Sequence, residues 1–123
     1  MDYDDAIRAH SNWKTHLRNY IRNPDRSISA TEVARDDVCE LGCWIRGHGR
    51  SHAGLPAFSK LQLAHAQFHL AAADIISRAD AGERVDDAVT FAAASPFGER
   101  SMEVVEALLS LRNQSKAAGT IGN

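Results

Sequence analysis

Apolar residues recur along the chain at the three- and four-residue spacing of helices, and proline or glycine separates the periodic segments. The pattern predicts a first helix over about residues 2–23, which Pro24 ends because a residue before proline avoids helical backbone angles. A second helix is expected to begin after Ser29, where a capping-box pattern with Glu32 occurs, and to end at Gly47.

The second half of the chain contains further helical segments. A long helix is predicted over about residues 56–81, a short one over about 84–94 and a last one over about 96–113. Four main helices with short or moderate loops indicate an all-α fold, namely an antiparallel four-helix bundle with an additional short helix. We expect one helical domain over residues 1–114 and a flexible C-terminal tail over residues 115–123, which is small and polar.

The length and charge of the chain argue against several classes of protein. The 123 residues suit a single domain, and the net charge of −2 is spread over interspersed acidic and basic residues, so we expect no nucleic-acid partner. We expect no membrane insertion, because no segment is long and apolar enough to span a bilayer. The start of the chain does not resemble a signal peptide, so we expect a cytoplasmic protein whose Cys39 and Cys43 form no stable disulfide.

Three histidines fall within the apolar faces of the predicted helices, where a polar side chain needs a partner. At about 100° per residue, His10 lies near the centre of the apolar face of the first helix. His65 and His69 lie in the middle of the apolar stripe of the long third helix, one turn apart on the same face. A single divalent ion would satisfy one nitrogen of each ring.

Cys39 lies at the flank of the apolar stripe of the second helix, and Gly42 on the same side would let a neighbouring helix approach the sulfur. A thiolate would complete a tetrahedron with three imidazoles, and mixed sulfur and nitrogen ligation is typical of zinc. Ligand type alone leaves copper and ferrous iron open. Cys43 lies further round the helix and is the weaker candidate. The sequence therefore predicts a Zn²⁺ ion held by His10, Cys39, His65 and His69.

Three segments resemble the motifs of the chemoreceptor zinc-binding domain family. Residues 10–14 (HSNWK), 39–44 (CELGCW) and 65–69 (HAQFH) match the family patterns HxxWK, CxLGxW and HxxxH in the same order. The resemblance extends over about residues 6–111. It implies a bacterial cytoplasmic helical bundle, often dimeric, whose zinc ligands fall on the four residues named above.

The resemblance also implies a role. Members of this family are usually attached to chemoreceptors or diguanylate cyclases, which they regulate in response to zinc or oxidants through the ligand cysteine. We therefore expect a homodimer with a signalling partner of one of these types. This chain resembles a stand-alone member without an attached output domain, and it carries Cys43 where the family often has a lysine.

Two readings of the zinc site stay open at this point: a regulatory module that responds to zinc or to thiol oxidation, and a purely structural zinc site in a small interaction or adaptor protein. An enzyme is disfavoured, because four protein ligands leave no position for a catalytic water and no HExxH motif is present. We accordingly expect no catalytic residues and no cofactor besides zinc. His16, His48 and His52 are expected to face solvent.

Cys43 follows Cys39 by four residues and could capture an oxidised Cys39 as a disulfide. In a continuous helix this spacing is near the geometric limit for a bridge, so some unwinding would be needed.

Overall fold

The computed structural model describes residues 2–122, except for the side chains of residue 87 and of residues 118–122. Every regular element in this part of the chain is helical, which confirms the all-α prediction. In chain order the elements are α1 (Tyr3–Arg22), α2 (Ala30–Val33), α3 (Glu40–Arg46), the 3₁₀ helix η1 (His48–His52), α4 (Pro56–Asp80), α5 (Asp87–Thr90) and α6 (Pro96–Gly122).

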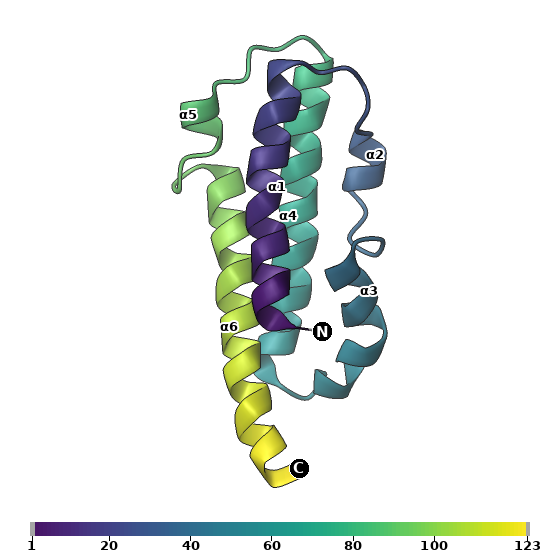
Figure 1. The fold of residues 1–123 in the computed structure, drawn as a ribbon, viewed down its shortest axis with the longest axis vertical. Coiled ribbons are helices and arrows are strands. Elements are labelled where there is room, and N and C mark those ends of the chain that lie inside the picture. Colours follow the sequence, from purple (N-terminus) through teal and green to yellow (C-terminus); the bar gives the residue numbers. More distant parts are fainter. Residues whose placement is uncertain (1, 123) are drawn as a thin grey trace.

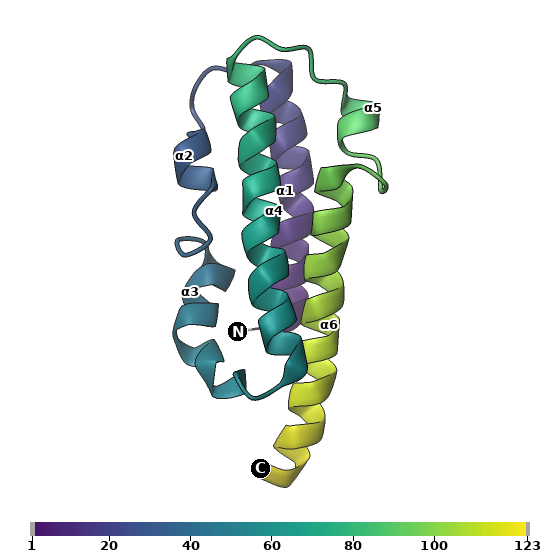
Figure 2. The same cartoon turned by 180° about the vertical axis from the view of Figure 1, so that it is seen from behind.

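Three long helices, α1, α4 and α6, lie side by side, and the shorter helices α2 and α3 follow one another along the opposite side of α4 from α6 (Figures 1 and 2). The chain ascends in α1, descends through α2 and α3, ascends in α4 and descends in α6 (Figure 1). The direction of the chain therefore alternates between α1, the α2–α3 segment, α4 and α6, so that α1 and α4 run in the same direction. Among the described residues, no helix is both long and apolar enough to cross a bilayer.

The prediction of one continuous second helix is wrong, because the chain leaves the helical path after Val33 and resumes it at Glu40. The start of α2 is as predicted, since the Ser29 hydroxyl accepts a hydrogen bond from the backbone N–H of Glu32 at 3.3 Å. Two consecutive aspartates at positions 36 and 37 explain the break. Aspartate is a poor helix former, because its short side chain can bond nearby backbone groups in non-helical conformations. In this segment the Arg35 guanidinium also donates to the Asp37 side chain at 3.1 Å.

Cys39 is the N-cap of α3 and not a residue inside a helix. Its backbone is extended, with φ −75° and ψ 165°, and its sulfur accepts a hydrogen bond from the Gly42 N–H at 3.3 Å. The predicted close approach at Gly42 occurs, but the neighbour is the loop that precedes Cys39 and not another helix. A Cβ at Gly42 would lie 1.9 Å from the carbonyl oxygen of Asp36.

The predicted bounds of the later helices differ from the structure in two places. The short helix predicted over residues 84–94 is reduced to the single turn of α5, and α6 continues to Gly122, past the expected end near residue 113. The flexibility of residues 115–123 stays a prediction. The ends of α1 are as expected, because the Asp2 carboxylate caps the first turn and the helix ends just before Asn23 and Pro24.

The core lies between α1, α4 and α6, and two residues of α3 extend it. Its most deeply buried large apolar side chains come from α1, α3, α4 and α6: Leu17, Leu41, Leu61, Phe68, Ile76, Val104, Leu108 and Leu111. At about 25 cal/mol per Å² of apolar surface, such burial is the main stabilising contribution. This core sets the distance between the inward faces of α1 and α4, from which the histidines project.

Replacing Gly42 by alanine is expected to lower the free energy of unfolding by about 1–3 kcal/mol, the usual cost of overpacking. The added methyl group would collide with the Asp36 carbonyl, which is backbone and must shift with its loop. Gly54→Ala is the matched control, because a Cβ there has no neighbour within 4 Å. Urea denaturation of both variants measures the difference, and equal effects would contradict close packing of the loop on α3.

Candidate metal centre

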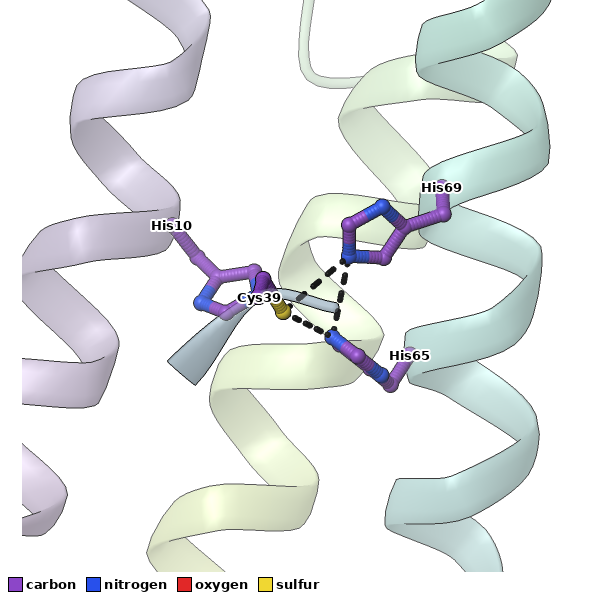
Figure 3. A group of neighbouring side chains, drawn as sticks. All are labelled: His10, Cys39, His65 and His69. Atoms are coloured by element: carbon purple, nitrogen blue, oxygen red, sulfur yellow. Dashed lines mark hydrogen bonds between the residues drawn. The ribbon is translucent and has the colours of Figure 1, made fainter. Parts of the chain in front are cut away.

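The four side chains selected from the sequence meet at one point inside the molecule. His10 comes from α1, Cys39 from the start of α3, and His65 and His69 from successive turns of α4 (Figure 3). One ligand-type atom of each residue lies within 4.8 Å of those of the other three. The folding of three separate segments therefore brings one sulfur and three imidazoles together.

The closest contacts within this cluster join the cysteine sulfur and the two α4 rings. Cys39 Sγ lies 3.2 Å from His65 Nε2 and 3.5 Å from His69 Nε2, and the two Nε2 atoms are 3.0 Å apart (Figure 3). Zinc at about 2.0–2.3 Å from tetrahedral nitrogen and sulfur ligands would place neighbouring ligand atoms about 3.3–3.6 Å apart. The separations among Cys39, His65 and His69 are close to these values, so these three residues fit such an ion. The ligand atom of His10 lies within 4.8 Å of the other three, and it would approach further on binding.

Backbone carbonyl groups orient two of the rings. Nδ1 of His10 lies 3.0 Å from the carbonyl oxygen of Ala6, and Nδ1 of His69 lies 2.8 Å from that of Val33. A ring whose Nδ1–H donates to a carbonyl keeps an unprotonated Nε2, which is the atom available to a metal. Sequence reasoning missed both carbonyl partners. Ala6 could have been found, because it precedes His10 by one helical turn, whereas Val33 depends on how α2 packs on α4.

All three rings of the cluster are almost completely buried, as their helical positions predicted: the exposed fraction is 4% for His10, 1% for His65 and 4% for His69. Burial lowers the pKa of His10 below its usual value. Burial, together with the neighbouring His69 and His10 rings, lowers the pKa of His65 to about 3. At neutral pH these two rings are therefore neutral, which is the form that binds a metal.

Cys39 differs from the histidines because it is only half-buried. Burial raises the pKa of its thiol, so the side chain alone favours the protonated form. A divalent cation at the centre of the cluster would reverse that preference, because a coordinated thiol loses its proton. The donor set therefore combines neutral nitrogens with one sulfur whose ionisation depends on a positive charge.

A small polar cavity of about 100 Å³ borders the cluster on the side of His65. Its wall includes Asp36 and Arg46, which form an ion pair at 3.1 Å, and also Arg50 and Gln62. The cavity brings surface residues next to an otherwise buried ring.

The two tryptophans of the motifs lie outside the cluster, and both pack against the apolar core. Trp44 contacts Tyr3 of α1 edge-on, with ring centroids 6.0 Å apart, and thereby ties α3 to α1. On its other side it packs on His52, at 5.6 Å. His16 and His48 are exposed as expected, but His52 is half-buried against this tryptophan, so that expectation was only partly right.

Comparison with protein families supports the resemblance seen in the three motifs. A family model described as the chemoreceptor zinc-binding domain matches residues 10–76, which is more than half of the chain. This segment contains all four residues of the cluster. Comparisons with curated proteins and with solved structures give no match.

The metal-free protein is expected to lose stability as the pH falls below about 6.5. The pKa of His65 is about 3 in the folded protein, whereas the unfolded chain takes up this proton near pH 6.5. Between these values the unfolded state binds the additional proton, so the free energy of unfolding decreases as the pH decreases.

Urea denaturation of zinc-stripped protein at about pH 7 and about pH 5 measures this loss, and His65→Gln is the control because it removes the titrating ring. We expect a smaller loss in the variant. The same loss in both proteins would show that His65 is not the group responsible.

Proposed function

The chain belongs to the chemoreceptor zinc-binding domain family, and from this premise we propose that it is a regulatory module whose zinc is held by His10, Cys39, His65 and His69. The observation that carries the proposal is the convergence of one sulfur and three imidazoles from three segments within 4.8 Å. When bound, zinc would supply a positive charge that binds these four side chains together and keeps the sulfur ionised.

The site joins two core helices to the α2–α3 segment, which has short helices and an irregular loop. His10 and the α4 histidines project from core helices, whereas Cys39 belongs to the α2–α3 segment, which follows an irregular path. The bond between His69 Nδ1 and the Val33 carbonyl attaches α2 to the same centre. We propose that zinc fixes this segment against α1 and α4, and that loss of zinc releases it.

Cys39 is the sensitive residue in this proposal. Cys39 is the most exposed residue of the cluster, and an oxidised sulfur is a poor zinc ligand. Oxidation would remove both a ligand and the side chain that caps α3 through the Gly42 N–H. Oxidation of the Cys39 sulfur would thereby change how the α2–α3 segment packs, and a partner protein could detect this change as a signal.

We propose further that the module acts in the cytoplasm as a homodimer and signals to a chemoreceptor-type or diguanylate-cyclase-type partner. The family supports the partner class. Leu63 and Leu70 support an association surface, because they are large, exposed and two turns apart on the same side of α4.

A structural zinc site is the second candidate. The near-complete burial of three of the four side chains favours it, since an ion held by core residues would be exchanged slowly. Zinc affinity discriminates the two functions: an affinity near the free zinc level of the cell supports regulation by zinc, and a site that never empties supports a structural role. We propose no catalysis, because four protein ligands would leave no open position on the ion.

Treatment of the zinc-loaded protein with hydrogen peroxide or hypochlorous acid is expected to release the zinc in step with modification of Cys39. The reason is that the oxidised sulfur no longer donates to the ion. A zinc-sensitive dye follows the release, and mass spectrometry follows the modification. His48→Ala should behave like the wild type, because His48 is exposed and lies outside the cluster. Complete modification of Cys39 without zinc release would reject regulation by oxidants.

A further inference from the structure

We propose that Cys43 is a resolving thiol for this site: once Cys39 is oxidised, Cys43 forms an intramolecular disulfide with it, and external thiols can then restore both cysteines. The inference rests on the proposed function of Cys39 as an oxidisable zinc ligand. It adds a residue outside the four-residue cluster and makes the oxidation reversible.

The backbone brings the two cysteines within bridging distance. The N–H of Cys43 donates a hydrogen bond to the carbonyl of Cys39 at 2.9 Å, which closes the first turn of α3 between them. Four residues of helical rise separate their Cα atoms by about 6 Å. Disulfides span Cα separations of about 4.4–6.8 Å, so this distance lies within the permitted range.

The sulfur of Cys43 lies against the backbone that directly precedes Cys39. It lies 3.6 Å from the carbonyl oxygen of Asp37 and 3.9 Å from that of Val38. The Val38 carbonyl belongs to the peptide bond that leads into Cys39. The Cys43 side chain therefore folds back over the beginning of α3 and lies beside the backbone of the residue with which it would react.

The break between α2 and α3 removes the obstacle that a continuous helix would present. Cys39 is extended and outside the helix, so its side chain can rotate towards Cys43 without unwinding a helical turn. Besides its contacts within the cluster, its sulfur is held by the Gly42 N–H at 3.3 Å. The expected need for local unwinding is therefore replaced by a side-chain rotation and a small movement of the preceding loop.

The exposure of Cys39 and Cys43 suits the role that we propose for each of them. Cys43 is exposed, so an external thiol can reach a disulfide formed there, whereas Cys39 is half-buried beside the buried histidines. A resolving thiol must be free when the oxidant arrives, and Cys43 lies outside the group of side chains that can hold the metal. In this proposal the Cys39 sulfur reacts with the oxidant, and the Cys43 sulfur reacts with the oxidised Cys39.

The proposed steps balance with a peroxide as the oxidant. Hydrogen peroxide transfers one oxygen atom to the Cys39 thiolate, which loses two electrons and becomes a sulfenic acid, and hydroxide leaves. The Cys43 sulfur then attacks the sulfenic sulfur, so that an S–S bond forms and the S–O bond breaks. The departing oxygen takes the thiol proton and leaves as water. Two equivalents of an external thiol reduce the disulfide and are themselves oxidised to a disulfide.

The test compares zinc-loaded wild-type protein with Cys43→Ser after a limited dose of hydrogen peroxide. Trypsin should cleave after Arg35 and Arg46, so both cysteines fall in one peptide, residues 36–46. In the wild type we expect this peptide to be lighter by two hydrogen atoms, and we expect dithiothreitol to restore its mass and the ability to rebind zinc. In Cys43→Ser we expect sulfinic and sulfonic acid at position 39 and loss of rebinding.

Over-oxidised Cys39 beside a free Cys43 thiol in the wild type would overturn the proposal, as would equal recovery of zinc binding in the variant. Unoxidised Cys43→Ser should contain as much zinc as the wild type and unfold at the same urea concentration, because Cys43 is exposed and outside the cluster. A zinc dye in the same samples keeps the two proposals apart. Retained zinc at a modified Cys39 contradicts the proposed function, whereas the peptide mass alone decides the role of Cys43.

Discussion

The structure depends on the burial of three imidazole rings whose nitrogens face one another and a cysteine sulfur. Burying a polar group without a partner is costly, and these rings are at most 4% exposed. Two carbonyl groups satisfy the outer nitrogens of His10 and His69, which leaves their inner nitrogens directed at a common centre. A single cation at that centre would satisfy all three rings and the sulfur at once.

The residues around this centre come from two kinds of structure: regular core helices and a less regular segment. The core between α1, α4 and α6 holds the histidines in place through apolar contacts that need no metal. The α2–α3 segment has short helices and an irregular loop, and it reaches the centre through Cys39 and the Val33 carbonyl. A site that joins a well-packed core to a less regular segment is suited to transmit the loss of one ligand. The half-buried Cys39 belongs to this less regular segment.

Much of the fold and of the cluster could be predicted from helical periodicity. His10, His65 and His69 interrupt apolar stripes, and an interrupted stripe predicts an inward position once the helix itself is correctly placed. Pro24 marks the end of α1, because a residue before proline avoids helical angles, and Pro56 marks the start of α4, because proline suits the first helical position. The backbone path between α2 and α3, which contains Cys39, was not predictable in this way. The apolar pattern of residues 34–45 continues across the break, although the helix is interrupted at the aspartates 36 and 37. The partnership of Val33 with His69 is a long-range contact, and no local pattern encodes it.

X-ray absorption spectroscopy at the zinc edge tests the central claim most directly, since it counts the sulfur and nitrogen neighbours of the bound ion. We predict one sulfur at about 2.3 Å and three nitrogens at about 2.0 Å in the wild type, and loss of the sulfur shell in Cys39→Ser. The Cys43→Ser variant should give the wild-type spectrum. Two sulfur neighbours, or a sulfur shell that survives the loss of Cys39, would contradict the assignment of Cys39, His10, His65 and His69 as the ligands.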